Sequence, residues 1–395
     1  MLVFANMKVD TIIVGAGLTG AVIAEREAAL NPDKQVLVIE QDPVIGGLCR
    51  DEYNSDGILI HRYGPHVFHT NDDVIFQYLN SFDDMVPYEF HVKASVHGNE
   101  YSLPFSLETI RQFYPPQLAN KCINSLIKRH GVDAVITLND LKDAIFKFEL
   151  VALGGDFHRN FVAPYNRKQW KEYSLEYGEE TAKRIPFRIN YDTRYFADKY
   201  CAIPKIGYTN IIENMLRRKN IHLMLNTDAR SILGGDTRRL VVFGELFTGN
   251  VYFTGSIDQL LPDRPALPFI STIHKFKTVY TETFQSTSQI NYPSHFEFTR
   301  IIEHKQLTGQ QHRHSTISME YPQLVTTSFN NNPRFMYPIR TEKHIKQYNS
   351  YIKELSKLKI FKQFKMCGRA GLYEYVNMDQ AVRKAIDLVK QVNQL

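Results

Sequence analysis

Three histidines stand close together in one short segment of this chain and have the chemistry of a functional site. His61, His66 and His69 flank the pair Gly64-Pro65. Such imidazoles can ligate a metal, or one of them can lie against a bound cofactor while Gly64 brings the backbone close to it. The segment has no i, i+4 histidine pair and no nearby acidic ligand, which weakens the metal interpretation. A metalloenzyme and a cofactor-dependent enzyme both stay open at this point.

A nucleotide-binding pattern lies upstream of the histidines. The β-branched run Thr11–Val14 leads into Gly15–Gly20, and an apolar stretch, Ala21–Glu27, predicts a helix after it. The first glycine of GxGxxG permits a tight turn, the second lets the backbone approach a pyrophosphate, and the third lets helix and strand pack closely. A second predicted strand, Gln35–Ile39, ends on Glu40, whose carboxylate suits a ribose hydroxyl. The pattern predicts a dinucleotide site formed by Gly15, Gly17, Leu18, Thr19, Gly20 and Glu40.

The choice between FAD and NAD follows from what comes next. Gly46 and Gly47 follow the acidic residue, and no second GxGxxG occurs downstream. An extended FAD would run past the second strand into another part of the protein, so these features favour FAD, with Gly46 and Gly47 near it.

Composition sets limits on the partners. The 395 residues carry a net charge of +5, from 47 basic and 42 acidic residues. This excess is too small to indicate a nucleic-acid partner, but it suits an anionic small substrate. The four cysteines form no CxxC, no signal peptide is evident, and no apolar run approaches the roughly 20 residues of a membrane helix. We expect a cytoplasmic protein with reduced thiols and no membrane partner.

Further elements are predicted along the chain. Residues 103–161 have a helical pattern, with Ser106 capping one helix and Pro115-Pro116 opening another. Asn139–Leu150 is expected to be an amphipathic helix, and residues 211–219 another, capped by 207–210. Strands are expected at 221–226, 239–243 and 250–254, antiparallel strands over 269–325, and a last helix that begins near Met378.

Five separated segments carry a family resemblance. They are His61–Thr70, Tyr165–Trp170, Lys183–Arg188, Phe298–Lys305 and Gly368–Gln380. In this order, and over nearly the whole chain, they closely resemble the UDP-galactopyranose mutase family.

The resemblance implies an α/β fold: a discontinuous Rossmann-like FAD-binding domain, an inserted helical domain and an antiparallel β-sheet domain. The FAD-binding domain would comprise residues 1–80, 201–256 and 360–395, the helical substrate domain 104–164, and the sheet domain 81–103, 165–200 and 257–359.

The resemblance also implies a redox-neutral isomerisation. UDP-galactopyranose and UDP-galactofuranose would interconvert after N5 of reduced FAD attacks the anomeric carbon and UDP leaves. The product would supply galactofuranose for cell-wall and other polysaccharides. The implied partners are the UDP-sugar, an external reductant such as NAD(P)H, and further copies of the chain in a homo-oligomer.

The implied residue roles fall into three groups. Arg184 and Arg300 would stabilise the leaving diphosphate, and His66 would lie against the isoalloxazine near N5, so the histidine segment needs no metal. The implied substrate-binding residues are Tyr165, which stacks on uracil, Trp170 beside the sugar, and Tyr195, Tyr337, Tyr375, Asn377, Arg62 and Asn291. The implied FAD contacts beyond the glycine loops are Gly64, Pro65, His66, Arg369, Met378, Asp379 and Gln380.

The chain departs from the family pattern at several positions. Leu48 replaces Asn, Ser256 replaces Pro, Ile270 replaces Arg, Lys171 replaces Gly after Trp170, and Asn377 replaces the more usual Asp. Several of these set the flavin environment or sugar contacts, so a mutase for UDP-N-acetylgalactosamine or dTDP-fucose is an alternative, with Arg62 as a candidate sugar selector. A flavin oxidoreductase of the amine-oxidase type and a non-catalytic nucleotide-sugar binder are the alternatives from other classes.

Overall fold

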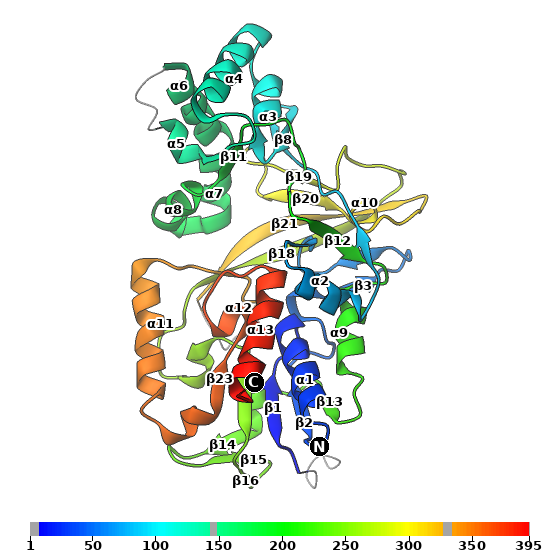
Figure 1. The fold of residues 1–395 in the computed structure, drawn as a ribbon, viewed down its shortest axis with the longest axis vertical. Helices are drawn as coiled ribbons and strands as arrows, with labels where there is room; N and C mark the ends of the chain where they lie inside the picture. Colours follow the sequence, from blue (N-terminus) through cyan, green and yellow to red (C-terminus); the bar gives the residue numbers. More distant parts are fainter. Residues whose placement is uncertain (1–7, 143–147, 327–333, 395) are drawn as a thin grey trace.

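The computed structural model describes residues 8–142, 148–326 and 334–394 of the chain. Three parts follow one another along the long axis: a Rossmann-like unit that contains both ends of the described chain, a large sheet, and a helical unit farthest from the termini (Figure 1). Within the described residues, none of the helices has both the length and the apolar character needed to span a membrane.

A five-stranded parallel sheet forms the centre of the Rossmann-like unit, in the order β13-β2-β1-β17-β23. Its strands are β1 (Thr11–Val14), β2 (Val36–Ile39), β13 (Ile221–Met224), β17 (Asn250–Phe253) and β23 (Phe364–Met366). They come from three distant parts of the sequence, so the unit is discontinuous. Neighbouring residues of β1 enter different cores, Ile12 on one face and Ile13 on the other, as expected for a parallel sheet buried on both faces.

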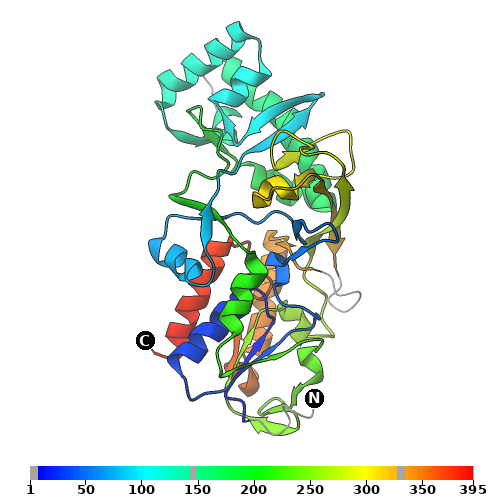
Figure 2. The same cartoon turned by 90° about the vertical axis from the view of Figure 1, so that its right-hand side faces the viewer.

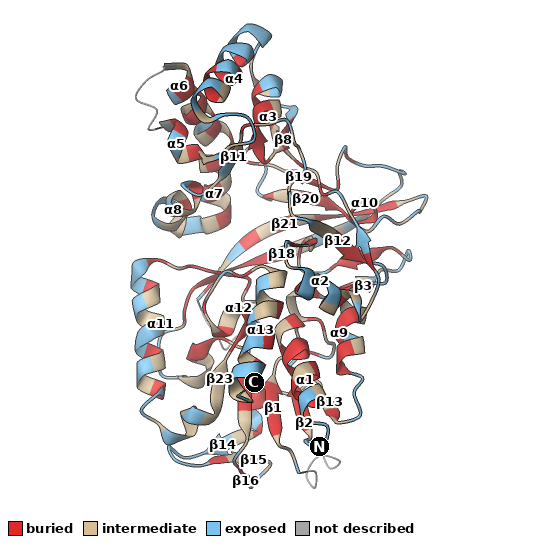
Figure 3. Cartoon of the chain, in the orientation of Figure 1, coloured by how far each residue is buried: buried red, intermediate tan, exposed pale blue. Residues whose placement is uncertain are grey.

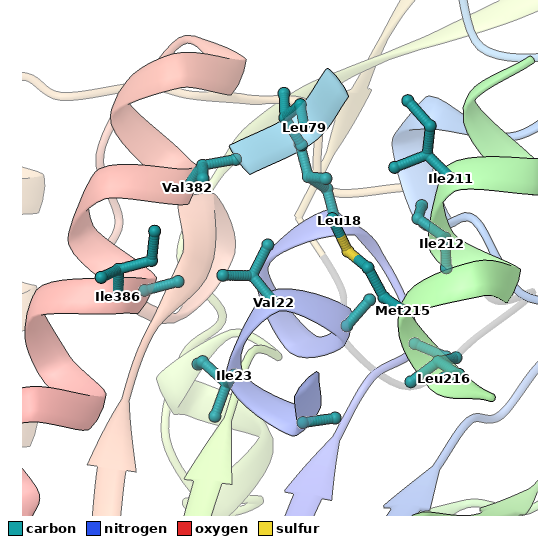
Figure 4. Close-up of a cluster of buried hydrophobic side chains, with 14 of the residues drawn as sticks. Leu18, Val22, Ile23, Leu79, Ile211, Ile212, Met215, Leu216, Val382 and Ile386 are labelled. Carbon is teal, nitrogen blue, oxygen red and sulfur yellow. The ribbon is translucent and has the colours of Figure 1, made fainter. Parts of the chain in front are cut away.

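Three helices cover one face of this sheet. They are α1 (Leu18–Leu30), α9 (Tyr208–Leu216) and α13 (Met378–Val392). Figure 4 shows Val22 and Ile23 of α1 between the apolar side chains of α13 and α9, with Leu79 of α2 (Asp73–Asn80) above them. A small sheet covers the other face: β14 (Leu233–Gly235), β15 (Leu240–Val242) and β16 (Glu245–Phe247).

The helical unit is built around its own aromatic core, in which Phe105, Phe157 and Phe187 are fully or almost fully buried. Its helices are α3 (Leu107–Phe113), α4 (Pro116–His130), α5 (Leu138–Lys142), α6 (Phe148–Phe157), α7 (Ala163–Trp170) and α8 (Glu179–Ala182), and its strands are β9 (Phe105–Ser106), β10 (Val135–Thr137) and β11 (Pro186–Arg188).

Local signals place the helix starts in this unit correctly. Ser106 forms a capping box at α3, and Pro116 opens α4. The helix expected over 139–150 is α5 and the start of α6, with 143–147 outside the described residues. The family resemblance groups residues 165–200 with the sheet domain, whereas Ala182 of α8 and Phe187 of β11 pack into the core of the helical unit. Figure 2 shows the three parts from the side.

A seven-stranded sheet joins the two units, in the order β22-β18-β21-β20-β19-β7-β8. Its strands are β7 (Val92–Val96), β8 (Asn99–Leu103), β18 (Phe269–Val279), β19 (Gln289–Asn291), β20 (Arg300–Glu303), β21 (Ser315–Val325) and β22 (Tyr337–Pro338). All neighbours are antiparallel except β19 and β7, so the expected antiparallel sheet contains one parallel pair.

The remaining strands and α-helices complete the fold. They are β3 (Asp51–Tyr53), β4 (Leu59–His61), β5 (Phe68–Thr70), β6 (Met85–Pro87), β12 (Tyr200–Pro204), α10 (His304–Thr308), α11 (Glu342–Leu355) and α12 (Gly368–Gly371). In Figure 3 the strands at the centre of the Rossmann-like unit are the most continuously buried, whereas α11 is exposed along its outer side. The segment from β4 to β5, which contains the histidines, lies between the parallel sheet and the large sheet.

Candidate active site

A glycine cradle forms one end of a long pocket in the Rossmann-like unit. Gly15, Gly17 and Gly20 line it at the start of α1, together with Leu18 and Thr19. Gly15 has φ +102°, and a Cβ there would lie 2.1 Å from the hydroxyl oxygen of Thr254; a Cβ on Gly20 would lie 1.9 Å from the Gly15 carbonyl oxygen. Only glycine fits at these two positions, as the fingerprint predicts. No side chain caps Gly17, so the first N–H groups of α1 face the pocket side of the turn.

The acidic residue at the end of β2 lies beside this cradle. Glu40 accepts the Ala16 N–H at 2.7 Å through Oε2 and the Asp42 N–H at 3.0 Å through Oε1. Burial raises the pKa of Glu40, while these two backbone donors act against the rise. Each carboxylate oxygen keeps a second lone pair, so Glu40 can still accept a ribose hydroxyl. Gly46 and Gly47 complete the turn opposite, where a Cβ on Gly47 would lie 2.8 Å from Cα of Gly17.

Arg334 also lines the first pocket, although no sequence motif marks it. Its guanidinium pairs with Asp42, donates to the Tyr63 hydroxyl at 2.8 Å, and lies 4.6 Å from the centre of the Tyr63 ring. The side chain therefore connects the segment before β22 to the Rossmann-like unit at the edge of the pocket. No local motif marks it, because its partners lie some 270 to 290 residues earlier in the chain.

The C-terminal motif forms another wall. Arg369 donates to the carbonyl oxygens of Met336 at 3.0 Å and Val376 at 2.7 Å, and it lines the pocket with Asn377 and Met378. Asn377 caps α13.

Two residues of this motif have other local partners. Gln380 accepts the Asn377 backbone N–H at 3.0 Å, and Asp379 accepts a 3.4 Å hydrogen bond from the Thr70 hydroxyl. Neither is among the residues that line the pocket.

A second pocket continues from the first, towards the large sheet. His66, Arg369, Asn377, Met378 and Leu48 line both. The remaining predicted site residues in its lining are Gly64, Pro65, Tyr195, Arg300, Tyr337 and Tyr375. A ligand that bridged the two would place its middle beside His66.

His66 is neutral, with a fixed tautomer. Its Nδ1 lies 2.9 Å from the Gly64 carbonyl oxygen, to which only an N–H can donate, so Nε2 is left as an acceptor. Burial, with a further contribution from His61, lowers the pKa of His66 to about 3. The backbone N–H of His66 donates to Nδ1 of His61 at 3.0 Å, and that of His61 donates to Nδ1 of His304 at 3.2 Å.

The arrangement of the histidines does not resemble a metal site. Nδ1 of His61, of His66 and of His304 is each occupied by a backbone group, and His69 Nδ1 lies 3.0 Å from the Asp198 carboxylate. Within residues 8–142, 148–326 and 334–394, no group of three or more His, Cys, Asp or Glu side chains is placed to hold an ion.

Arg300, the first residue of β20, has a defined orientation. Its Nε donates to Glu320 Oε2 at 2.5 Å, and its Nη2 donates to the Tyr337 hydroxyl at 3.3 Å. Burial lowers the pKa of Arg300, but the Glu320 carboxylate together with Tyr337 and Tyr165 outweighs burial, and the pKa lies well above its ordinary value. A permanently charged guanidinium thus lines the second pocket.

Aromatic side chains surround this guanidinium. Tyr337 and Tyr375 stack with ring centres 5.8 Å apart, and Trp170 approaches Tyr337 edge-on at 6.4 Å. Burial raises the pKa of both Tyr165 and Tyr195, and the charge of Arg300 opposes the rise at each. The structure therefore places Tyr165, Tyr195 and Tyr337 near the charge of Arg300. Tyr375 and Trp170 contact the ring of Tyr337.

Five of the predicted catalytic and substrate-binding residues are not in the lining of the second pocket: Tyr165, Trp170, Arg184, Arg62 and Asn291. Arg184 is exposed at the end of α8, where its charge lowers the pKa of Tyr177, which burial otherwise raises. Arg62 lies 5.3 Å from the Phe276 ring centre and 3.8 Å from Glu52. Asn291 accepts a 2.8 Å hydrogen bond from Gln289. Gln289, and not Asn291, lines the second pocket, and no sequence motif marks it.

Comparison with known proteins relates this geometry to a family. A family model described as UDP-galactopyranose mutase matches residues 160–375, more than half of the chain, and one for an NAD(P)-binding Rossmann-like domain matches residues 13–82. The chain is 31% identical to a dTDP-fucopyranose mutase of Escherichia coli, over 95% of this chain and 96% of the relative. The chain belongs to the UDP-galactopyranose mutase family. As a member of this family of mutases, the protein is an isomerase.

Two further matches cover almost the whole chain. A UDP-galactopyranose mutase of Mycoplasma genitalium is 28% identical over 97% of this chain and 94% of its own length. The crystal structure of a reduced UDP-galactopyranose mutase has the same fold, with a TM-score of 0.61 at 14% identity, covering 98% of this chain and 94% of the other.

Membership of a flavin-dependent mutase family points to a flavin cofactor, and the residues present fit one. Gly15, Gly17 and Gly20 line the first pocket at the start of α1, where helix N–H groups can bind a pyrophosphate, and Glu40 lies beside them with a carboxylate that suits a ribose hydroxyl. The isoalloxazine end would reach His66 and Arg369, which line both pockets.

Proposed function

We propose that this mutase interconverts the pyranose and furanose forms of UDP-galactose, with FAD in the first pocket and the sugar diphosphate in the second. The observation that carries this proposal is the junction of the two pockets at His66 and Arg369, with Arg300 in the second. Reduced FAD would supply the nucleophile for the anomeric carbon.

The chain's own residues would stabilise and orient the departing group. Negative charge grows on the diphosphate as it leaves, and the Arg300 guanidinium can meet it without reorganisation because Glu320 and Tyr337 fix its direction. Tyr195, Tyr337 and Tyr375 supply hydroxyl groups along the same wall. Neutral His66 offers Nε2 as an acceptor, and the buried setting limits access of water.

Arg184 would complete the site by movement of its loop. It is exposed near Tyr177, and Tyr177 packs edge-on against Trp170 at 4.8 Å. A closing motion of the segment from Trp170 to Arg184 would bring a second cation to the diphosphate and cover the sugar. Tyr165, on the same helix as Trp170, would stack on the base.

The test uses dithionite-reduced enzyme and UDP-galactofuranose. Chromatography should show UDP-galactopyranose, with no conversion by the oxidised form. Absence of conversion while reduced flavin is bound would overturn the proposal. UDP binding without turnover would instead identify a nucleotide-sugar binder.

A dTDP-fucose mutase is the second candidate. The Escherichia coli relative has that name, and apolar side chains line the second pocket, among them Val67, Phe90, Phe196 and Met336. Apolar walls suit a 6-deoxy sugar, which has a methyl group where galactose has a hydroxymethyl group. A panel of UDP-galactose, UDP-N-acetylgalactosamine and dTDP-fucose, compared by kcat/KM, separates the candidates.

The remaining proposals concern the reductant, the cellular location and the assembly. We propose NAD(P)H as the reductant, a cytoplasmic location and a homo-oligomeric assembly. Anaerobic bleaching of the flavin by NADPH tests the first, and light scattering of the purified protein tests the last. An amine-oxidase-type oxidoreductase would instead form peroxide stoichiometrically with its substrate under air.

A further inference from the structure

A buried histidine and a buried glutamate face each other beneath the segment that lines the second pocket. Nδ1 of His274, on β18, lies 3.9 Å from Oε1 of Glu320, on β21, and the two side chains are 3% and 1% exposed. Neither atom has a hydrogen-bond partner among the described residues. A Cβ on Gly64 would lie 3.0 Å from this same Oε1 and 3.6 Å from Cε1 of His274, so the pair lies against the Gly64 backbone.

The surroundings of His274 determine which ring nitrogen holds the hydrogen. Nε2 lies 2.6 Å from the Thr272 hydroxyl oxygen, and that hydroxyl donates its only hydrogen to Sδ of Met336 at 3.1 Å. With the Thr272 hydroxyl donating to Met336, Nε2 of His274 is the donor to Thr272. In the neutral ring Nδ1 is then bare, and two acceptors face each other across 3.9 Å. Buried polar atoms are rarely left in this state, and one added proton would satisfy both.

Charged groups of both signs surround His274. Burial lowers the pKa of His274, Glu320 raises it, and Arg300 and Arg62 lower it. Buried His304 is another titratable group nearby; burial, then His61 and then His274 lower its pKa. Tyr165 and Tyr337 lie near Glu320 and Arg300 on the pocket side. The other oxygen of Glu320 is held by Arg300, so the group of His274, Glu320 and Arg300 has no net charge while His274 is neutral.

We propose that His274 takes up a proton from solvent when the diphosphate of a nucleotide sugar engages Arg300, and that its new Nδ1–H donates to Glu320. This inference rests on the proposed function, because it requires a diphosphate at Arg300. The anion offsets the positive charge that opposes protonation, so binding shifts the group from neutral to a net charge of +1. Glu320 gains a second cationic partner, and Arg300 then offers the diphosphate a charge that is less neutralised by its own carboxylate. His274 acts through Glu320 and is a positioning residue.

Calorimetry of ligand binding tests the proton uptake directly. Oxidised holoenzyme is titrated with UDP-galactose, which binds without conversion, in buffers of different ionisation enthalpy near pH 7. The diphosphate diester does not titrate near this pH, so the buffer dependence of the heat counts protons taken up by the protein. We expect wild-type protein to take up a proton fraction that approaches one per site, and H274Q to lose it. The matched control H222Q, which alters a histidine bonded to Gln35 on the Rossmann-like unit, should keep the wild-type value.

The pH dependence of affinity gives an independent readout. Uptake of one proton predicts that the Kd for UDP-galactose rises with pH by up to about tenfold per unit in the titrating range, and that H274Q flattens this slope. H274N serves if H274Q does not fold. Equal proton uptake in wild type and H274Q, or none in wild type, overturns the proposal. Uptake without turnover by reduced enzyme overturns only the proposed reaction, and failure of every nucleotide sugar to bind overturns both.

Discussion

The ammonium group of Lys168 lies 2.8 Å from the carbonyl oxygen of Phe298, two residues before Arg300. It also donates to the carbonyls of Phe296, at 3.0 Å, and Tyr292. Three N–H groups thus match three backbone acceptors. The contact ties helix α7 to the strand that begins with Arg300.

Substitution of Lys168 should loosen the base and sugar contacts. Tyr165 and Trp170 share α7 with Lys168, and K168M leaves three carbonyls without their donor, at a cost of about 1–3 kcal/mol. We expect KM for the nucleotide sugar to rise about tenfold or more with a smaller change in kcat. Steady-state kinetics of reduced enzyme check this, with K346M, at an exposed pair with Glu342 on α11, as the unaffected control. An unchanged KM would show that α7 is held by other contacts.

Removal of Arg300 should affect the reaction more than the cofactor. In R300A the diphosphate loses a fixed cation, and kcat/KM should fall by about 10²- to 10³-fold, with flavin still bound. Glu320 is left buried without its partner, which should lower the free energy of unfolding by about 3–5 kcal/mol. Kinetics, the flavin spectrum and urea unfolding measure the three effects. Activity near that of wild type would remove Arg300 from the reaction.

Local requirements could be predicted from sequence. Gly15 and Gly20 meet backbone or side-chain atoms so closely that only glycine fits, and the caps at Ser106 and Pro116 depend on neighbouring residues. The motif around Arg300 marked this arginine as a candidate site residue. It did not predict the pairing of Arg300 with Glu320, 20 residues away on another strand.

Long-range partners were not predictable from sequence. Arg334, His274 and Gln289 carry no motif. Arg334 contacts Asp42 and Tyr63 far away in sequence, His274 faces Glu320 on another strand, and Gln289 lines a pocket formed by separate parts of the chain. Arg184 has a motif, but its side chain is exposed, and its role depends on a loop position that a local pattern does not specify.

Arg334 should hold the cofactor. Its contacts with Asp42 and Tyr63 close the first pocket at one edge, and R334A removes both. We expect the Kd for FAD to rise about tenfold, the equivalent of one charge-assisted hydrogen bond. Titration of apoprotein with FAD, followed by flavin fluorescence, measures this. R264A, which breaks an exposed pair with Glu354, should bind FAD as wild type does, and equal affinity in R334A would contradict the assignment.

Acid should destabilise the protein through its buried histidines. Burial lowers the pKa of His61 from 6.5 to about 4, so below pH 6.5 the unfolded chain binds a proton that the folded chain does not. The free energy of unfolding therefore decreases as the pH is lowered from 6.5 towards 4, by up to about 1.4 kcal/mol per pH unit. H61N keeps an acceptor for the His66 N–H but does not titrate. Between pH 6.5 and 5, urea unfolding should show a loss about 1.5 kcal/mol smaller in H61N than in wild type; parallel losses would exclude His61 as the source.

Lys171 occupies a backbone conformation that favours glycine. It ends α7 with φ +53° and ψ −129°, directly after Trp170. A side chain there costs about 1–3 kcal/mol, whereas glycine costs about 0.5–1 kcal/mol in chain entropy. K171G should therefore raise the free energy of unfolding by about 1 kcal/mol in urea denaturation. K171A removes the charge but keeps Cβ, and it should give no gain. If K171A stabilised the protein as much as K171G, the cause would be the charge of Lys171 and not its backbone strain.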